Sequence, residues 1–488
     1  MRASIILSGI VALICCNAFS QSFDNNWVFA DSAGLNFSSG EPVSFVSSST
    51  GHEAFASISD SAGNLLFYTN GSRVWNRNHE MMPNGDSLLI AEPFMHFGSS
   101  MTQGVLILPW PGNEGLYFLF HIQTTGLRYS IVNMAADDAN GDVIEKNILL
   151  LDFEIGEKMH AVKHGNGRDW WLIMGKRIEV EVGDDDFYDN IFTRFLISTD
   201  GLSGPFYQDY GPDMDENSTS SVGQMIFARD GNKMVFTREQ ELVLYDFDRC
   251  SGEFSNYTSI HVEDYTYGVS ISPDATKIYV NNSVSNKLYQ FCLNCDGIPV
   301  DSTKELVYEG PPGPYWMAQH LLGPDGKIYI ATGYKFIPSD FFSSVNQNLN
   351  VINQPNEIFP LCDFDTNTVS LGERRVIGGL PNMPNYSLGV LTGSECDTLG
   401  TTTQNAEVTN GLNIYPNPAD EYIYFSGSIP GNALINVSIF SIDGKLQLYI
   451  PEAHTNNGIN ISILPCGIYS IFFQTHQGML YISKLVKF

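Results

Sequence analysis

The stretches Val269-Ser-Ile-Ser-Pro-Asp-Ala-Thr-Lys-Ile-Tyr-Val280 and His320-Leu-Leu-Gly-Pro-Asp-Gly-Lys-Ile-Tyr-Ile330 decide the fold of this chain of 488 residues. Each is an apolar strand, a tight polar turn and a second strand rich in β-branched and aromatic residues, a pattern typical of a β-hairpin. Four similar units precede them, at residues 57–68, 106–118, 161–173 and 226–236. Six hairpins therefore recur along the chain.

The spacing of these hairpins predicts the architecture. The separations between successive turns are 52, 54, 64, 44 and 51 residues, measured from Asp60 through Gly112, Asn166, Asp230, Asp274 and Asp325. One four-stranded propeller blade with its loops has about this length. We predict an all-β chain with a β-propeller over residues 21–397, with seven blades preferred and six possible. The alternative is a β-sandwich, or two stacked β-domains, but sandwich strands recur at about 8 to 12 residues without a longer period.

A seventh blade requires strands from both ends of this body. We expect residues 26–29 and 34–37 to supply two of them from the N-terminal side. Residues 350–352 and 386–388 are the expected partners from the other end.

The amino-acid composition of the chain favours β-structure, and its net charge excludes one class of partner. The chain has 23 Tyr, 31 Phe and 44 Gly with only 16% charged residues, which favours strands and turns over helices. Its net charge of −29 repels phosphate backbones, so we expect no nucleic acid partner. No segment after the N-terminus is long and apolar enough to predict a transmembrane span.

Residues 1–20 have the three parts of a secretory signal: the charged Arg2, an apolar run over residues 5–16, and Ala18-Phe19-Ser20 before Gln21. Export to an oxidising compartment allows disulfides. The disulfide candidates are Cys250, Cys292, Cys295, Cys362 and Cys396. We expect Cys250 to pair with Cys292 or Cys295, and Cys362 with Cys396, although spacing leaves the connectivity open.

After Cys396 the composition changes twice. Residues 398–410 are rich in Thr, Gly and Asn and predict a linker, and residues 411–488 predict a small immunoglobulin-like β-sandwich. This last unit contains, in order, Tyr415-Pro-Asn-Pro418, Asp443-Gly-Lys445, Gly467-Ile-Tyr469 and the terminal Lys484-Leu-Val-Lys-Phe488. A carbohydrate-binding or adhesion sandwich is the alternative for such a unit.

The four motifs resemble, in order and spacing, the C-terminal (type A) sorting domain of Bacteroidetes type IX secretion substrates. Cys466 departs from the pattern, where a small or polar residue is usual. The body resembles a propeller-like family of exported Bacteroidetes proteins, through residues 56–69, 74–79, 319–329 and 381–386. The resemblance implies passage through the periplasm, recognition of residues 411–488 by the type IX machinery, and release or anchoring at the outer-membrane surface.

Catalytic motifs are incomplete in this sequence. Gly85-Asp-Ser-Leu88 matches an esterase signature, but no His has an Asp three residues before it, and no Gly-x-Ser-x-Gly elbow occurs. His160 and His164 lack the His-Glu-x-x-His pattern and are expected to be ordinary packed or exposed histidines. The acidic runs 184–186 and 363–367 leave room for Ca²⁺ but lack the spacing of a calcium loop. We therefore predict no cofactor, metal or catalytic residue.

The function predicted is binding of an extracellular glycan, peptide or protein by the propeller. The candidate ligand-binding residues are Glu53, Trp75, Arg77 and Arg128, with Glu53 and the two arginines expected to line the central channel. Trp75, Trp170, Trp171 and Trp316 are candidates to stack on sugars, although core packing is the commoner use of such residues. A secreted polysaccharide hydrolase or lyase, and a structural adhesin, are the alternatives.

Overall fold

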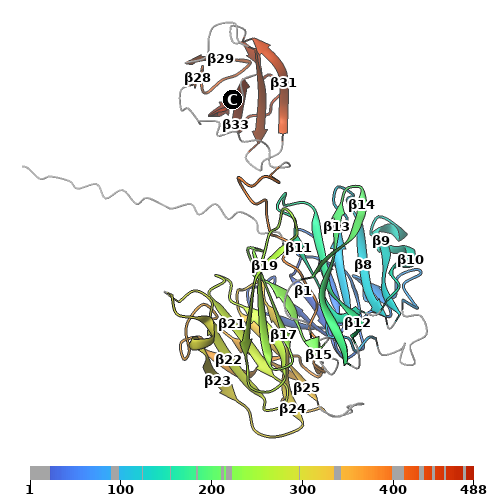
Figure 1. Ribbon diagram of the computed structural model, residues 1–488. Coiled ribbons are helices and arrows are strands. Elements are labelled where there is room, and N and C mark those ends of the chain that lie inside the picture. The colour runs from blue at the N-terminus through green and yellow to red at the C-terminus, as the bar shows by residue number, and fades with distance from the viewer. Residues whose placement is uncertain are drawn as a thin grey trace, which may run out of the picture. The chain divides into compact units, whose positions relative to one another are not determined.

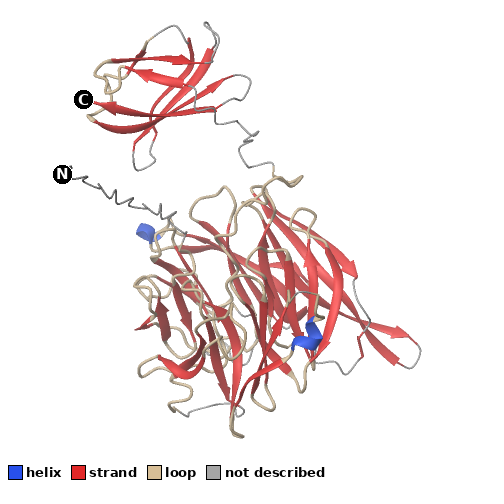
Figure 2. Cartoon of the chain, turned by 90° about the vertical axis from the view of Figure 1, so that its left-hand side faces the viewer, coloured by secondary structure: helices blue, strands red, loops and turns tan. Residues whose placement is uncertain are grey.

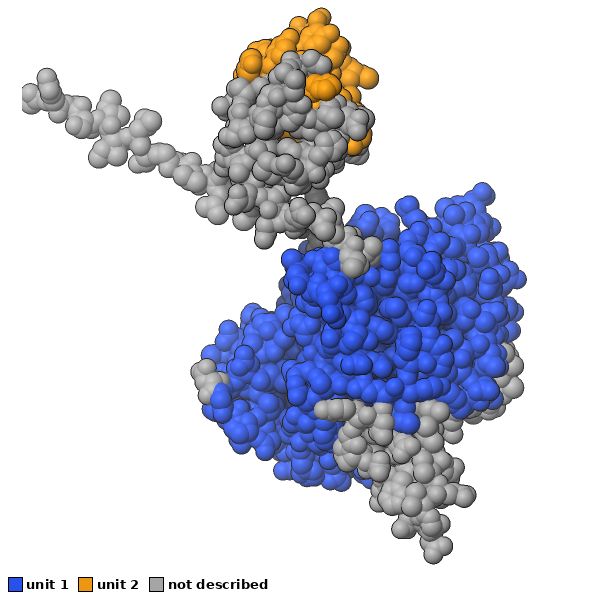
Figure 3. All heavy atoms as spheres, turned by 45° about the horizontal axis from the view of Figure 1, so that its top comes forward, with its two compact units in different colours: residues 1–397 blue, residues 398–488 orange. Residues whose placement is uncertain are grey.

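A computed structural model describes residues 22–488, apart from short gaps at 89–97, 124, 154, 183–184, 210–213, 216–221, 296, 335–341, 398–411, 428–433, 442–445, 455–457 and 476–479. The predicted signal and linker, and the Asp443-Gly444-Lys445 turn, lie outside the described residues. The chain divides into two compact units, residues 1–397 and 398–488 (Figure 3).

The first unit consists of antiparallel sheets (Figures 1 and 2), of which the described residues form seven. Two are three-stranded: β1 (Asn26–Phe29), β2 (Ala33–Asn36), β3 (Val43–Val46); and β4 (Ala56–Ser59), β5 (Leu65–Thr69), β6 (Val74–Asn76). The next two are β7 (Val105–Pro109), β8 (Leu116–Gln123), β9 (Gly126–Asn133), β10 (Asp142–Leu151); and β11 (Ile155–Lys163), β12 (Trp170–Val182), β13 (Asp185–Ser198), β14 (Gly201–Asp209), with β15 (Met214–Asp215) beside β13.

Three further sheets of four strands complete the unit. They are β16 (Met225–Phe227), β17 (Lys233–Arg238), β18 (Glu241–Phe247), β19 (Phe254–His261); β20 (Thr266–Ile271), β21 (Lys277–Asn282), β22 (Lys287–Cys292), β23 (Glu305–Glu309); and β24 (Tyr315–Leu322), β25 (Ile328–Tyr334), β26 (Asn348–Ile352), β27 (Phe364–Ser370). Short 3₁₀ turns occur at Asp137–Ala139 and Val300–Thr303. Within the described ranges, no helix has the length and hydropathy of a membrane span.

The first strands of successive sheets are neighbours, in the order β4, β7, β11, β16, β20 and β24. Such a ring of inner strands defines a β-propeller, because each sheet buries its faces against the sheets on either side. The gap between β24 and β4 is filled by residues 375–381. Arg375 forms an isolated β-bridge with Asp31, and Pro381 forms one with Phe55, the residue before β4. The backbone N–H of Gln319 in β24 donates to the Gly378 carbonyl at 3.2 Å. The ring is therefore closed by both ends of the unit.

The predicted closing strands were right on the N-terminal side and wrong on the other. β1 and β2 do lie in the closing sheet, but residues 350–352 belong to β26, paired with β25. Residues 386–388 form no strand. The hydrophobic pattern marks these segments as buried without saying which sheet buries them, and the true closing segment, Arg375–Pro381, is irregular and rich in Gly and Pro.

The turn markers work as side-chain caps of the hairpins. The Oδ1 atoms of Asp60, Asp230, Asp274 and Asp325 each accept a backbone N–H from two residues further on, at 2.9 to 3.2 Å. Asn166 does the same toward Arg168 at 3.0 Å. Gly112 instead supplies a positive φ of 72°. The repeated Asp or Asn is therefore present because its side chain stabilises the turn of each hairpin.

The cysteines pair differently from the prediction. Cys250 is bonded to Cys396, and Cys292 to Cys295, while Cys362 is buried and free and Cys466 is exposed and free. Cys362 lies instead beside Tyr279. Spacing did not reveal that the end of the unit returns to the turn between β18 and β19, where Cys250 lies. The Leu391 N–H also donates to the Gly165 carbonyl at 2.7 Å, so this end is held over the propeller face.

The second unit has two sheets around one apolar core (Figure 1). One contains β28 (Leu412–Tyr415), β29 (Tyr422–Gly427) and β32 (Ile459–Asn460). The other has the order β31 (Leu446–His454), β30 (Leu434–Ser441), β33 (Gly467–Thr475) and β34 (Leu480–Lys487).

Its Tyr-Pro-Asn-Pro motif holds the terminal strand in place. The side chain of Asn417 donates to the Lys484 carbonyl at 2.5 Å and accepts the Val486 N–H at 2.8 Å. The Ala419 N–H donates to the Val486 carbonyl, and the Phe488 N–H to the Ala419 carbonyl. The first and last motifs of the unit are thus parts of one structure.

Candidate functional site

The axis of the propeller is filled by four buried amide side chains, which we call the axial amides: Gln103, Gln224, Gln319 and Asn382. Gln103, just before β7, exchanges two hydrogen bonds with the backbone of Met225 in β16. Gln224 exchanges two with the backbone of His320 in β24. Gln319 donates to the Thr102 carbonyl, beside Gln103. Three inner strands are therefore tied to one another in a triangle across the axis.

Asn382 completes this network from the closing segment. Its Nδ2 donates to the carbonyls of Val105 and Met159, at 3.0 and 2.8 Å, and its Oδ1 accepts from Gln103 at 3.3 Å. Because the axial amides occupy the channel, its two ends are separate. One end lies where the inner strands begin, and the other where they end.

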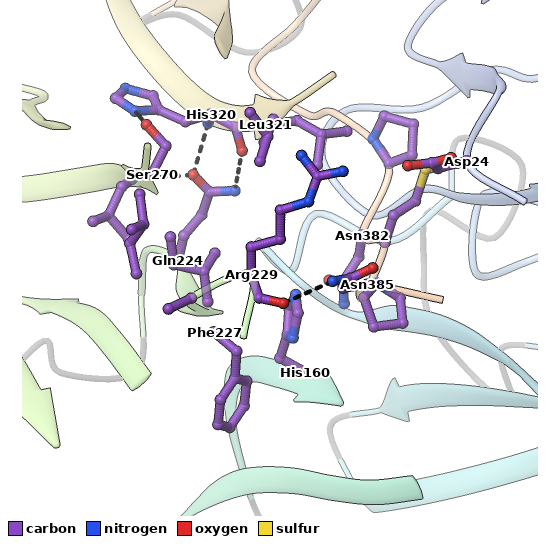
Figure 4. Close-up of a pocket in the computed structure, with 18 of the residues that line it drawn as sticks. Asp24, His160, Gln224, Phe227, Arg229, Ser270, His320, Leu321, Asn382 and Asn385 are labelled. Carbon is purple, nitrogen blue, oxygen red and sulfur yellow. Dashed lines mark hydrogen bonds between the residues drawn. The ribbon is translucent and has the colours of Figure 1, made fainter. Parts of the chain in front are cut away.

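A pocket lies at the end of the inner strands, which we call the strand-end pocket (Figure 4). It is a cavity of about 130 Å³ lined by residues of β11, β16, β20 and β24 and by residues 381–385 and 388. Gln224 and Asn382 form part of its floor, and Phe227, Leu321 and Leu388 are among its apolar lining residues. Asp24 and Arg229 also line it, and the two side chains lie on the same side of the view (Figure 4).

His160 brings an unused hydrogen-bond acceptor to this pocket. Its ring is 6% exposed, and its Nδ1 lies 3.0 Å from the Ala161 carbonyl oxygen, which can only accept. The ring proton is therefore on Nδ1, and Nε2 is an acceptor. Within the described part of the chain, no hydrogen-bond partner reaches Nε2. Burial lowers the pKa of His160 to about 4, which keeps the ring neutral at physiological pH.

Ser270 and His320 resemble a nucleophile and its base, but the proton is in the wrong place. Asn281 accepts the Gly268 N–H through Oδ1, so its Nδ2 donates both to the Ala318 carbonyl and to Nε2 of His320, at 2.9 Å. Nδ1 of His320 must then carry the proton that it donates to Ser270 Oγ, at 3.0 Å. A histidine that donates to the serine cannot accept its proton.

Charges are confined to the rim of the pocket. Burial raises the pKa of Asp24, and the positive charge of Arg229 acts in the opposite direction. Arg229 is exposed, and its carbonyl accepts a hydrogen bond from Asn385 Nδ2 at 2.8 Å (Figure 4). Burial lowers the pKa of His320 to about 3, so both histidines on the floor are uncharged.

At the opposite end of the channel, two carboxyl groups each accept a hydrogen bond from a neighbouring hydroxyl group. Tyr267 donates to Glu53 Oε1 at 2.9 Å and lies 3.3 Å from Thr102 Oγ1, which donates to Glu157 Oε2 at 2.8 Å. Trp316 packs edge-on against Tyr267, with ring centroids 4.6 Å apart. Burial first, and then the like charge of Glu157, raise the pKa of Glu53 to about 8. Glu53 therefore keeps its proton at neutral pH.

Of the predicted ligand-binding residues, the structure places only Glu53 at the channel. Trp75 is buried and stacks on Tyr68, with centroids 5.4 Å apart. Arg77 is exposed after β6, and Arg128 in β9 donates to the Asn147 carbonyl at 3.0 Å. The expectation that both arginines line the channel is wrong, because only the first strand of each sheet faces the axis.

The three other candidate tryptophans differ in how exposed they are. Trp170 and Trp171 are buried in β12, whereas Trp316 is partly exposed beside Tyr267. The sequence did not single out Ser270, His320 or the axial amides, and it treated His160 as an ordinary packed or exposed residue. Each lies in or within a few residues of the first strand of a hairpin repeat, but this position alone does not distinguish them from other polar residues there: Gln103, His160, Gln224, Ser270, Gln319 and His320.

No three His, Cys, Asp or Glu side chains gather to hold a metal within the ranges that the structure describes. Of the two acidic runs considered for Ca²⁺, Asp184 lies outside those ranges. Asp365 of the other run accepts a hydrogen bond from Asn353 at 3.0 Å.

Comparison with known families identifies the second unit. Residues 413–487 match the family described as the secretion system C-terminal sorting domain. Among curated proteins, none matches this chain.

Solved structures similar to the chain are distant. A protein of unknown function from Desulfotomaculum acetoxidans is 11% identical, with 74% of this chain and 99% of that chain covered, at a TM-score of 0.41. A putative 6-phosphogluconolactonase from Bacteroides uniformis is 12% identical (72% and 98% covered, TM-score 0.41), and the periplasmic gluconolactonase PpgL of Pseudomonas aeruginosa is 10% identical (81% and 97%, TM-score 0.36). Likenesses this distant say nothing about what this chain binds.

The molecule is thus an exported protein with a β-propeller body. More specifically, it carries the sorting domain of type IX secretion substrates, which directs it through the outer membrane for secretion or display at the cell surface.

The pKa of Glu53 predicts a pH-dependent stability. Between pH 4.5 and about 8 the folded state holds a proton that the unfolded state releases, so this group makes the protein less stable as the pH rises. Gln mimics the protonated carboxyl. Glu53→Gln should therefore stabilise the protein by about 1–3 kcal/mol at pH 8, and by much less at pH 5. Urea unfolding followed by tryptophan fluorescence measures this, because all six Trp lie in residues 1–397. An equal effect at both pH values would contradict the assignment.

Proposed function

We propose that this exported propeller binds an extracellular glycan, peptide or protein in its strand-end pocket. The observation that carries the proposal is the free Nε2 acceptor of His160 in a cavity where the neighbouring amides are already hydrogen-bonded. Nε2 is not one of the buried polar atoms without a partner, so it is accessible from the cavity. A ligand that displaces water from this nitrogen must donate a hydrogen bond in its place. An apolar pocket with few unsatisfied polar groups is the usual form of a binding site.

The chemistry of the pocket supports binding over turnover. Ser270 faces a histidine that donates to it, so the pair lacks the proton arrangement of an acyl-transfer enzyme. A structural adhesin, the other alternative, would not need a cavity with a free imidazole nitrogen in its lining.

Hydrolysis of a glycosidic bond is a second candidate, favoured by Glu53 and Glu157, the two carboxyl groups at the other end of the channel. Glycoside hydrolysis requires two carboxyl groups, one of which holds its proton at neutral pH, and Glu53 meets that second requirement. In that case Glu53 is the acid, and Glu53→Gln abolishes turnover of a polysaccharide while leaving binding in the strand-end pocket unchanged.

For the second unit we propose docking of residues 411–488, as an immunoglobulin-like sandwich, to the type IX machinery. The contacts of Asn417 with the terminal strand support this, because they join the first and last family motifs into one surface.

Blocking the pocket tests the binding proposal. Asn385 is partly exposed at the rim, and Asn385→Trp should cover the opening without disturbing the core. Ala62→Trp is the matched control, in the exposed turn between β4 and β5 and outside the pocket lining. On glycan and peptide arrays, the full exported chain should lose its signal at least tenfold with Asn385→Trp and keep it with Ala62→Trp. Equal signals for both variants would refute a ligand in this pocket.

The sorting proposal predicts that Asn417→Ala blocks export. Both side-chain hydrogen bonds to the terminal strand are lost, so the full chain should accumulate in the periplasm of a type IX-competent host. Asn460→Ala is the control, because among the described residues the Asn460 side chain bonds to Tyr422 and Ser462 and not to the terminal strand. Fractionation and immunoblotting measure the distribution, and normal surface delivery of Asn417→Ala would show that this contact is not needed.

A further inference from the structure

We propose that the strand-end pocket receives an uncharged, hydroxyl-bearing ring, the terminal sugar of a neutral glycan, with one hydroxyl donating to Nε2 of His160. This inference rests on the proposed function, which assigns a ligand to the pocket without naming its chemical class.

The nitrogen of His160 in this pocket requires a hydrogen-bond donor from the ligand. Nε2 of His160 is an acceptor, because Nδ1 holds the ring proton against the Ala161 carbonyl. A ligand that offers only acceptors, such as a carboxylate or a phosphate, displaces water from this nitrogen without giving it a hydrogen bond. The group that enters must therefore present an O–H or an N–H.

The residues at the floor of the pocket carry no charge. His160 and His320 are neutral, and the hydrogen-bonding atoms of Gln224 and Asn382 are occupied by backbone groups and by Gln103. An ammonium group at this depth would lose its hydration without meeting an opposite charge, and that penalty is large. A neutral hydroxyl carries no such cost, so the O–H is favoured over a charged N–H donor.

The size of the pocket and its apolar wall fit a single ring. A cavity of about 130 Å³ is well below the roughly 300–1,000 Å³ of pockets that enclose drug-sized ligands. It suits a single ring and excludes a folded segment of protein. Phe227, Leu321 and Leu388 give that ring an apolar surface to lie against, as the C–H face of a sugar requires.

The rim agrees with a ligand that is neutral overall. Asp24 and Arg229 carry opposite charges, so neither selects strongly for a charged ligand (Figure 4).

The test compares matched oligosaccharides that end either in a neutral hexose or in a uronic acid, together with a peptide array, on the full exported chain. The best array ligand is then titrated by calorimetry against His160→Leu, His160→Gln and Arg229→Gln. We expect neutral ends to bind, and His160→Leu to weaken them by about tenfold, the value of one buried hydrogen bond. His160→Gln keeps an acceptor and should lose less. Arg229→Gln, at an exposed position, should change affinity less than threefold.

Several results would overturn this inference while leaving the proposed function standing. One is binding that Asn385→Trp abolishes but that is restricted to uronic acid ends or peptides. Another is a loss of tenfold or more with Arg229→Gln, which would identify an anionic ligand. A third is full affinity in His160→Leu. No binding on either array, or binding that Asn385→Trp leaves unchanged, would overturn the proposed function and this inference together. Tryptophan fluorescence checks that each variant is folded.

Discussion

Hydrogen bonds from four buried amide side chains across the propeller axis hold together strands that are far apart in the chain. Gln103, Gln224 and Gln319 connect inner strands separated by 122, 96 and 217 residues. Asn382 adds contacts across 277 and 223 residues. Each bond pairs a buried amide with a backbone group that has no access to water, so losing one side chain leaves several groups unsatisfied. The ring of sheets depends on this network for closure as well as on its apolar faces.

The same network divides the channel and so determines where function is located. At one end, Glu53 and Glu157 accept hydrogen bonds from Tyr267 and Thr102, and Glu53 holds a proton. At the other, the amides become the floor of a pocket whose free atom is the nitrogen of His160. The closing segment serves both purposes, because after Asn382 it passes Arg229 and is tied by Cys396 to Cys250. Ring closure and pocket formation are therefore consequences of one segment.

The sequence predicted what local patterns encode. The Asp and Asn of each hairpin turn act within a few residues, so their spacing revealed the repeat, and four motifs in order revealed the sorting domain. The closing strand, the disulfide partners and the axial amides depend on which distant segments meet. Arg375–Pro381 has no strand pattern, and Gln103 or His160 has no local signal that distinguishes an axial position from an ordinary polar one. Arg77 and Arg128 failed as channel residues for the same reason.

The central claim is that the axial amides lock the propeller, and Asn382→Leu tests it most directly. Leu has nearly the same volume but leaves the carbonyls of Val105 and Met159 and the Gln103 amide without this partner. Urea unfolding, followed by fluorescence of tryptophans that lie only in the propeller, should show a loss of about 2–4 kcal/mol. Asn385→Leu breaks two hydrogen bonds, but both are exposed and water can replace them, so it should cost under about 1 kcal/mol. A variant Asn382→Leu as stable as the unchanged protein would contradict the account.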